Sequence, residues 1–168
     1  MKELERVDRL HLNAAEEWLK LGNVASASNA LEKITPENRA HPSVLLLVYQ
    51  IHARAGKWNM AAAAAEGLTR VMPDNPSAWI WLAISTRRKT GGGIQQAKDV
   101  LIEAKNKFPE EPQISYNLAC YECQLGHVLA AKLRLKEAFD LADGIELRQK
   151  ALNDPDLEPL RKEIEQIS

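Results

Sequence analysis

The sequence predicts an all-α fold made of about four helical hairpins, and two observations lead to this prediction. First, a glycine followed five residues later by an alanine recurs at intervals of 34 to 36 residues. A repeat of that period is typical of arrays in which each unit is a pair of helices. Second, apolar residues on both sides of each glycine recur at helical spacing, and no stretch has the strict alternation of a half-buried strand. The four pairs are Gly22/Ala27, Gly56/Ala61, Gly92/Ala97 and Gly126/Ala131.

The hairpins are expected, in chain order, over approximately residues 8–39, 42–75, 76–111 and 112–143. In each hairpin the glycine supplies the turn between two helices, because glycine adopts left-handed backbone conformations without strain. A proline followed by an acidic residue closes the first three hairpins, at Pro36, Pro73 and Pro109. Proline interrupts helix propagation, so these positions mark the links between units. The third turn is longer by two residues, in the stretch "KTGGGI".

Residues 145–168 are expected to form a C-terminal capping helix. The apolar residues Leu157, Leu160, Ile164 and Ile167 recur at helical spacing among charged ones. Such a stripe can cover the apolar face that the last unit of a repeat array leaves open. The stretch Asp154-Pro155-Asp156 has the residue types that begin a helix, so the capping helix is expected to start there.

These units resemble the tetratricopeptide repeat (TPR), a 34-residue helical hairpin with the pattern W-x2-L-G-x2-Y…A-x3-F…P. The third unit matches best, and the fourth is next. The third fills the pattern with Trp79, Leu82, Ala83, Ala97, Leu101 and Pro109, and the fourth with Leu118, Ala119, Gly126, Ala131, Leu135 and Ala138. The resemblance implies a right-handed superhelical solenoid that forms one domain over residues 1–168. In size and repeat type the chain is also similar, more weakly, to small bacterial kinesin-light-chain-like TPR proteins.

Composition and motifs predict a protein without catalytic residues, cofactor or metal. The formal net charge of −1 argues against a nucleic-acid-binding protein, which normally carries a strongly basic face. The four histidines form no metal-binding motif, and the glycine-rich turn follows no strand, so it does not indicate a phosphate loop. Cys120 and Cys123 lie in the middle of a predicted helix, where two ordinary thiols are expected instead of a redox or zinc motif.

The segment "MKELERVDRL" lacks the apolar core of a signal peptide, and the longest apolar run is too short to span a bilayer. A cytoplasmic protein is therefore expected.

In the family that the repeats resemble, the first helix of each hairpin lines an inner groove. Carried over to this chain, the resemblance implies a groove that is mostly apolar and aromatic. Its members would be Leu12, Leu46, Gln50, Ile80, Trp81, Ile84, Tyr116, Asn117 and Cys120. Trp79 falls in the packing position of the repeat and is expected in the core, whereas Trp81 is expected in the groove. A groove of this character suits a helix or an extended peptide with buried anchors. Alternatively, the capping segment or a second copy of the protein fills it.

A second surface is expected at the ends of the groove-lining helices. It contains Arg54, Lys57, Arg87, Arg88 and Lys89, which we call the basic edge. Cations at helix C-termini are favoured by the helix dipole alone. The functional alternative is a ridge that binds an acidic partner, such as a protein tail or an anionic membrane surface.

Three functions are compatible with these features. The first is a non-enzymatic scaffold or adaptor that binds a partner protein through its groove. The second is an assembly protein that binds a tubulin-like cytoskeletal polymer through its basic edge. The third is a chaperone for a secreted substrate. The sequence indicates neither the partner nor the oligomeric state.

Overall fold

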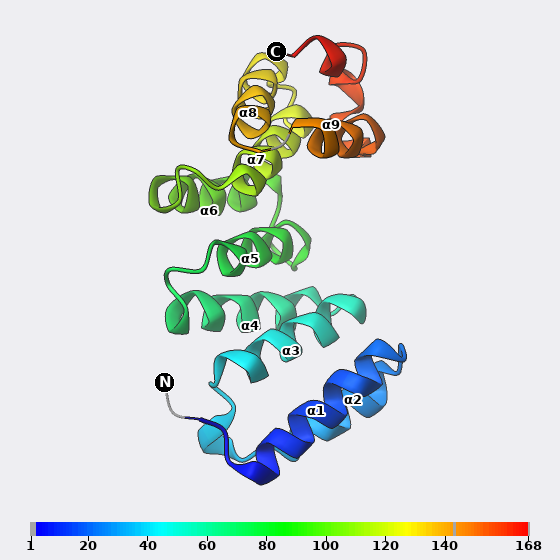
Figure 1. Ribbon diagram of the computed structural model, residues 1–168, viewed down its shortest axis with the longest axis vertical. Helices are drawn as coiled ribbons and strands as arrows, with labels where there is room; N and C mark the ends of the chain where they lie inside the picture. The colour runs from blue at the N-terminus through cyan, green and yellow to red at the C-terminus, as the bar shows by residue number, and fades with distance from the viewer. Residues whose placement is uncertain (1–2, 143, 168) are drawn as a thin grey trace. The chain divides into compact units, whose positions relative to one another are not determined.

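Figure 1 shows the computed structural model of the chain, which describes residues 3–142 and 144–167. Every regular element in these residues is a helix, so the predicted all-α class is confirmed. The chain divides into two compact units, Met1–Gly91 and Gly92–Ser168. The division falls in the long turn of the third predicted hairpin, residues 76–111, whose two helices belong to different units. The expectation of one domain over residues 1–168 stays a prediction.

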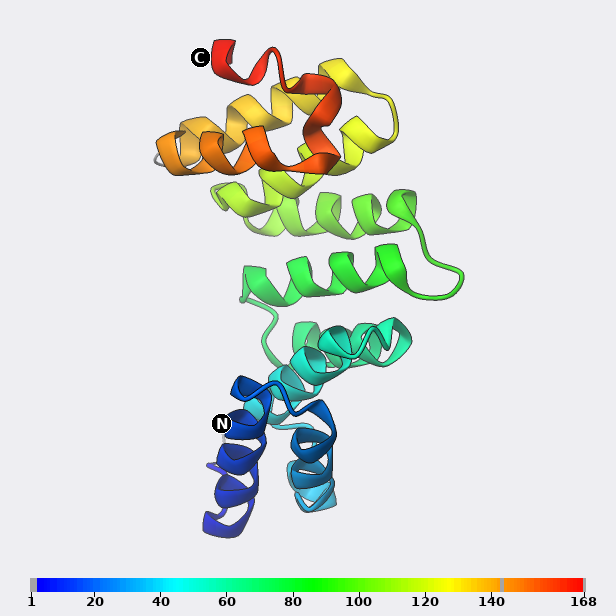
Figure 2. The same ribbon diagram turned by 90° about the vertical axis from the view of Figure 1, so that its right-hand side faces the viewer.

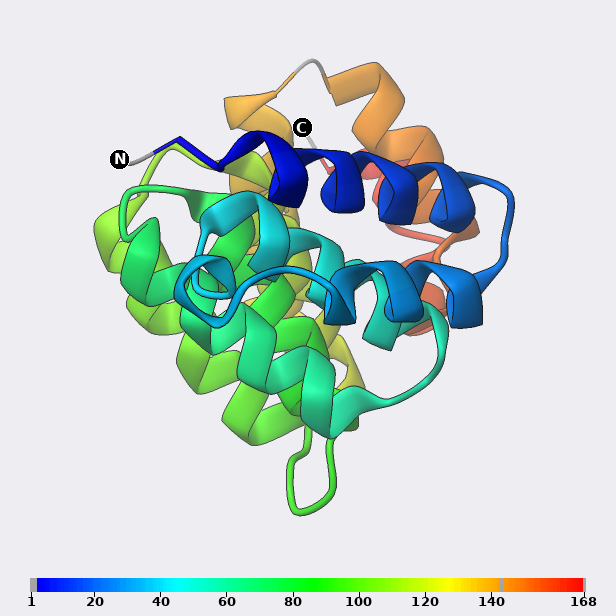
Figure 3. The ribbon, with the colours of Figure 1, turned by 90° about the horizontal axis from the view of Figure 1, so that it is seen from below.

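The first unit contains five α-helices that pack in consecutive pairs. They are α1 (Arg6–Lys20), α2 (Val24–Glu32), α3 (Pro42–Arg54), α4 (Trp58–Val71) and α5 (Pro76–Arg88), with the 3-10 turn η1 (Pro36–Asn38) between α2 and α3. Helices α1 and α2 form an antiparallel hairpin, which Figure 3 shows side by side in two shades of blue. Helix α4 packs against both α3 and α5.

Small residues lie at the centre of these helix contacts. Ala27, Ala61 and Ala65 have no exposed surface, and each lies on the second helix of its hairpin. An alanine at such a position lets paired helices approach closely, as the repeat predicts. Larger apolar side chains, among them Ile34 and Leu68, fill the space around them.

The turns of three hairpins have the same hydrogen-bonded geometry. In the turn after α3, the Gly56 N–H donates to the Ala53 carbonyl at 3.1 Å, and the Lys57 N–H donates to the His52 carbonyl at 2.9 Å. This pair of bonds is the Schellman motif, and it requires the positive φ of 68° found at Gly56. Gly22 and Gly126 occupy the same position in their own turns.

The third turn differs from the prediction. Helix α5 ends at Arg88, and its cap residue Lys89 is already extended. The two additional residues let the chain continue before it reverses, so the positive φ falls on Gly91. The sequence pattern had placed the turn glycine at Gly92, which was wrong by one residue. Gly93, with a φ of 166°, is extended and precedes the next helix.

The second unit is built around α7. Its α-helices are α6 (Ile94–Lys107), α7 (Pro112–Gln124), α8 (Val128–Leu141) and α9 (Gly144–Asn153), followed by the 3-10 turns η2 (Pro155–Leu160) and η3 (Ile164–Gln166). Helix α7 packs against α6, α8 and η2, and α9 packs against α8. Figure 2 shows α9 and the C-terminal turns, in orange and red, lying beside the hairpin of α7 and α8.

The C-terminal segment covers apolar surface as predicted, but its conformation differs from the predicted capping helix. Leu157, Leu160 and Ile164 have no exposed surface, and Ile167 is also buried. However, the α-helix of this segment precedes Asp154 instead of starting there, and residues 155–166 form 3-10 turns. Pro159 explains the difference, because proline lacks the N–H that an α-helix needs and its ring clashes with the preceding turn. Asp143 and Ser168, at the ends of the predicted fourth hairpin and capping segment, lie outside the described residues.

Candidate interaction site

A hollow of about 630 Å³ lies between α1 and α3 in the first unit. Glu16, Leu19 and Lys20 of α1 form one side of it, and Leu46 and Gln50 of α3 lie one turn apart on the other. The remaining lining residues also come from α3, and they are Ser43, Leu47, Tyr49, Ala53 and Arg54. Two of the predicted groove residues, Leu46 and Gln50, therefore line an open hollow in the structure.

The floor of this α1/α3 hollow is apolar and its rim is charged. Leu46 is half-buried and Gln50 is exposed, so the hollow offers an aliphatic surface beside a side-chain amide. On the rim, Lys20 Nζ lies 2.7 Å from Glu17 Oε1, and the guanidinium of Arg54 donates to the Leu19 carbonyl at the end of α1. That carbonyl belongs to the last turn of α1, so Arg54 also complements the negative end of the helix dipole.

An aromatic pair lies at the floor of the hollow, which Tyr49 lines. The rings of Tyr49 and Trp81 stack with centroids 5.3 Å apart and planes 25° from parallel. Tyr49 is almost fully buried and Trp81 is half-buried, and burial raises the pKa of the Tyr49 hydroxyl. The pair joins α3 to α5, because Trp81 comes from the latter helix. Trp79 is buried as expected, and its Nε1 donates to the Pro73 carbonyl at 3.3 Å.

The other predicted groove residues of the first unit lie deeper than expected. Leu12 is part of the core around α1 and α2, with 5% of its surface exposed. Ile80 is buried and Ile84 is half-buried on α5. Fewer residues of the first unit therefore line open surface than the sequence predicts for a groove.

In the second unit the C-terminal segment covers two of the three predicted groove residues, Tyr116 and Cys120. Tyr116 is 1% exposed, and its hydroxyl donates to Asp154 Oδ2 at 2.8 Å. Lys150 Nζ lies 4.3 Å from the centre of the Tyr116 ring. Cys120 is buried with its Sγ 3.8 Å from the same Asp154 oxygen. Asn117 is half-buried and accepts a hydrogen bond from Gln113 Nε2. Asp154 and Lys150 therefore lie against Tyr116 and Cys120 of α7, and the filling of a groove by this segment stays a prediction.

The burial of this contact raises the pKa values of its titratable hydroxyl and thiol groups. Burial and the Asp154 hydrogen bond both raise the pKa of the Tyr116 hydroxyl. Burial raises the pKa of the Cys120 and Cys123 thiols, and the two cysteines are free. Protonated thiols are poor nucleophiles and poor metal ligands. Within residues 3–142 and 144–167, no three His, Cys, Asp or Glu side chains come together as a possible metal site.

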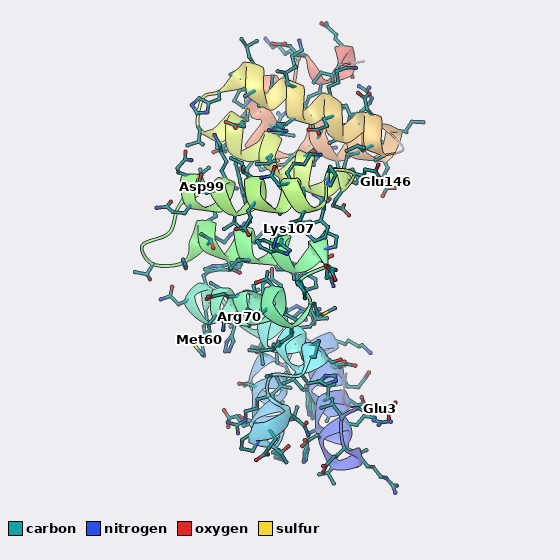
Figure 4. All side chains as sticks on the ribbon, turned by 90° about the vertical axis from the view of Figure 1, so that its left-hand side faces the viewer. Glu3, Met60, Arg70, Asp99, Lys107 and Glu146 are labelled. Atoms are coloured by element: carbon teal, nitrogen blue, oxygen red, sulfur yellow. The ribbon has the colours of Figure 1, made fainter. Side chains whose placement is uncertain are left out.

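The basic edge contains a second, smaller hollow of about 340 Å³. Lys57 and Arg88 line it together with Trp58 and Met60, and the Arg88 guanidinium lies 4.9 Å from the centre of the Trp58 ring. Met60 is exposed on the surface of α4 (Figure 4). Asn59 Oδ1 accepts a hydrogen bond of 2.8 Å from the Thr90 N–H, which holds the turn after α5 against α4.

The other predicted members of the basic edge are placed differently. Arg54 lies on the rim of the α1/α3 hollow, as described above, so it is separate from the Lys57 and Arg88 hollow. Lys89 is the half-buried cap residue of α5, and Arg87 is half-buried in the last turn of that helix. The structure thus gathers only Lys57 and Arg88 around one hollow.

Sequence reasoning missed part of the α1/α3 hollow. Ser43, Ala53 and Arg54 line it but were not predicted as groove residues. Their spacing from Leu46 and Gln50 follows one helical face, at steps of three or four residues, and this signal could have identified them.

None of the helices in the described part of the chain is both long and apolar enough to cross a membrane.

The chain has the fold of known TPR structures. No family model and no curated protein matches its sequence. Its structure is similar to that of TTC0263, a thermophilic TPR protein of Thermus thermophilus, with a TM-score of 0.68, 20% identity, and coverage of 94% of this chain and 82% of that one. It is also similar to a MamA RS-1 ArsTM double mutant, with a TM-score of 0.70 and 13% identity over 89% of this chain and 80% of that one. A third similar structure, MamA MSR-1 C2, has a TM-score of 0.67 and 19% identity over 80% and 76%. At these identities the likeness shows the fold, and the weaker resemblance to kinesin-light-chain-like proteins stays a prediction.

Proposed function

We propose that the protein is a non-enzymatic interaction module that holds a segment of a partner protein in the α1/α3 hollow. The observation that carries the proposal is the pairing of an apolar floor, at Leu46 and Tyr49, with a charged rim. Binding sites for small ligands and anchor side chains have volumes of about 300–1,000 Å³, and this hollow falls within that range. It can therefore receive one or two apolar side chains of a peptide.

The rim indicates which kinds of residue such a peptide would carry beside its anchor. Glu16 and Lys20 stand on α1 and Arg54 stands on α3, so charges of both signs surround the floor. The Gln50 amide has both a donor and an acceptor, as a peptide backbone does. A peptide with an aliphatic or aromatic anchor between polar residues fits this arrangement, because the anchor is buried while the flanking groups keep polar partners.

Selection from a random peptide library tests the proposal. Peptides selected on the intact chain are measured by fluorescence polarisation against the wild type, Gln50→Arg and Ile145→Arg. Gln50 is exposed in the hollow, and Ile145 is a 70% exposed residue of α9 that serves as the matched control. We expect Gln50→Arg to weaken binding at least about tenfold, because a longer charged side chain occludes the floor. Equal binding to all three proteins, or no enrichment on the wild type, contradicts the proposal.

The basic edge supports a second candidate function, binding to an acidic polymer. The supporting observation is that Lys57 and Arg88 line one hollow with the half-buried Trp58 and the exposed Met60. We expect the double substitution Lys57→Glu/Arg88→Glu to abolish salt-sensitive binding to immobilised polyglutamate. Arg70→Glu is the control, because Arg70 is an exposed cation elsewhere on α4 (Figure 4). Its guanidinium lies 2.9 Å from Glu66 Oε1. Retained binding in the double variant, or binding insensitive to salt, excludes this function.

A further inference from the structure

One face of α1, together with its C-cap residue Leu21, exposes a row of apolar side chains. Val7, Leu10, Trp18 and Leu21 are 62%, 61%, 43% and 75% exposed. Ala14, between them, is exposed as well. A helix turns by about 100° per residue, so these five positions fall within an arc of about 80°. We call this row the α1 stripe.

The stripe is separate from the surfaces that α1 already uses. Leu12, Ala15 and Leu19 point into the core with α2 and α3, and Glu16 and Lys20 face the α1/α3 hollow. An exposed apolar row of this length is typical of an interaction surface.

The positions of the stripe are symmetric about Ala14. Val7 and Leu21 are each seven residues from it, and Leu10 and Trp18 are each four. When two copies of α1 pair antiparallel about a two-fold axis, Val7 of one copy meets Leu21 of the other, and Leu10 meets Trp18. The two Ala14 residues then meet at the axis, where their small side chains let the helices approach to about 8–10 Å. A surface that complements itself in this way fits the isologous interface of a two-fold dimer.

Charge and area favour the same arrangement. In the antiparallel pair, Arg6 of one copy and Glu17 of the other stand on the same flank, about five residues apart along the axis. That separation is about 7.5 Å, which the long arginine side chain spans. The two helix dipoles also oppose each other instead of running parallel. Together the two stripes remove on the order of 1,000 Å² from water, which is the lower end for a specific interface.

We propose that the α1 stripe binds the α1 stripe of a second copy, giving an antiparallel two-fold dimer. The small interface predicts a weak dimer, with a dissociation constant on the order of micromolar. The α1/α3 hollow lies on a different face of the helix and stays open in each copy. The dimer therefore does not depend on the function proposed above.

Sedimentation velocity of the purified chain over a range of concentrations tests the dimer. We expect the wild type to dimerise and Leu10→Glu to raise its dissociation constant at least about tenfold, since a carboxylate would be buried against Trp18 of the second copy. Trp18→Glu is the second variant, and far-ultraviolet circular dichroism confirms that both remain folded. Leu129→Glu, at an 80% exposed residue of α8, is the control. A monomeric wild type overturns the proposal, as does a dimer that Leu129→Glu dissociates, because the interface would then include α8.

Cysteine crosslinking tests the antiparallel register. Ala14→Cys is expected to form a covalent dimer under a mild oxidant, whereas Ala63→Cys, at an exposed alanine of α4, is not. The wild type supplies the background, because Cys120 and Cys123 are buried. Val7→Cys and Leu21→Cys, carrying different tags, are expected to crosslink to each other when mixed. Crosslinks within each variant but not between them indicate a parallel pair and overturn the proposed register.

Discussion

Replacing Tyr116 by phenylalanine tests whether the C-terminal segment is held on α7 by the hydrogen bond to Asp154. The hydroxyl donates to the Asp154 carboxylate at 2.8 Å. The substitution removes this donor and keeps the ring, which has 1% of its surface exposed. Lys150 can therefore keep its position over the ring, and the change isolates a single hydrogen bond.

The expected loss of stability depends on how well the Asp154 carboxylate stays hydrogen-bonded in the variant. Hydrogen bonds to charged groups contribute about 1.5–3 kcal/mol. In the variant Asp154 keeps two donors, because its Oδ1 still accepts from the Asp156 N–H at 3.0 Å and the Cys120 thiol stays 3.8 Å from its Oδ2. We therefore expect Tyr116→Phe to lower the free energy of unfolding of the second unit by about 1–2 kcal/mol. Tyr116→Ala also leaves a cavity, and we expect it to cost about 3–5 kcal/mol.

The distribution of aromatic residues makes the measurement specific. All four tryptophans belong to the first unit, so tryptophan fluorescence monitors its unfolding. Far-ultraviolet circular dichroism monitors the helices of both units. Hydrogen exchange measured by mass spectrometry then locates the effect in peptides that cover α7 and η2. We expect faster exchange in those peptides for Tyr116→Phe, and unchanged exchange there for the control Tyr49→Phe, because Tyr49 belongs to α3 of the first unit.

The reasoning is refuted if Tyr116→Phe leaves the exchange of the α7 and η2 peptides and the urea midpoint unchanged. Asp154 would then not hold the C-terminal segment on α7. A loss of protection confined to α1–α5 would equally contradict it, because the substituted residue belongs to the second unit.

Three further predictions concern a buried carboxylate, a turn glycine and a buried ion pair. Hydrogen bonds from Thr35 hold the pKa of the buried Asp8 carboxyl below its ordinary value of 3.8. The ionised carboxylate therefore stabilises the folded state above that pH, and this contribution is lost as the pH falls through the lowered pKa. Asp8→Asn should therefore lower the urea midpoint at pH 7 and make the midpoint less dependent on pH below about 4. Gly56→Ala should cost about 1 kcal/mol or more by forcing a side chain into a positive φ, with Gly67→Ala in α4 as the control, and thermal unfolding would detect it. Lys98 Nζ lies 2.9 Å from Oε1 of the buried Glu122, and Lys98→Met removes this partner, so the thermal midpoint should fall. The double variant with Glu122→Gln should recover part of the loss, because it also removes the buried charge.

The repeat pattern predicted most of the fold because each signal it uses is local. A glycine before an alanine specifies a turn and a close helix contact within a single hairpin, and Gly22, Gly56 and Gly126 adopt the expected turn. The third turn departed from the pattern because two inserted residues changed where the chain reverses. The C-terminal 3-10 turns departed from it because Pro159 overrides an apolar spacing that is otherwise helical.

The candidate site was only partly predictable, because exposure depends on contacts between distant segments. The resemblance to the tetratricopeptide repeat implied equivalent groove positions for Leu46 and Tyr116, yet one lines a hollow and the other is covered. The cover over Tyr116 comes from Asp154, 38 residues further along, in a segment that is not part of any repeat. No periodicity relates that segment to α7, so the sequence left open whether it filled the groove.

The segment on α7 has a consequence for any ligand of that helix. Because residues 154–160 are tethered to the surface they cover, they act as a built-in competitor whose effective concentration is on the order of millimolar for a short linker. A free peptide that binds the same face of α7 must outcompete it, so its apparent affinity for the intact chain is much lower than for the uncovered helix. A variant with a shortened segment is therefore expected to bind such a peptide more tightly, although no residue of α7 changes.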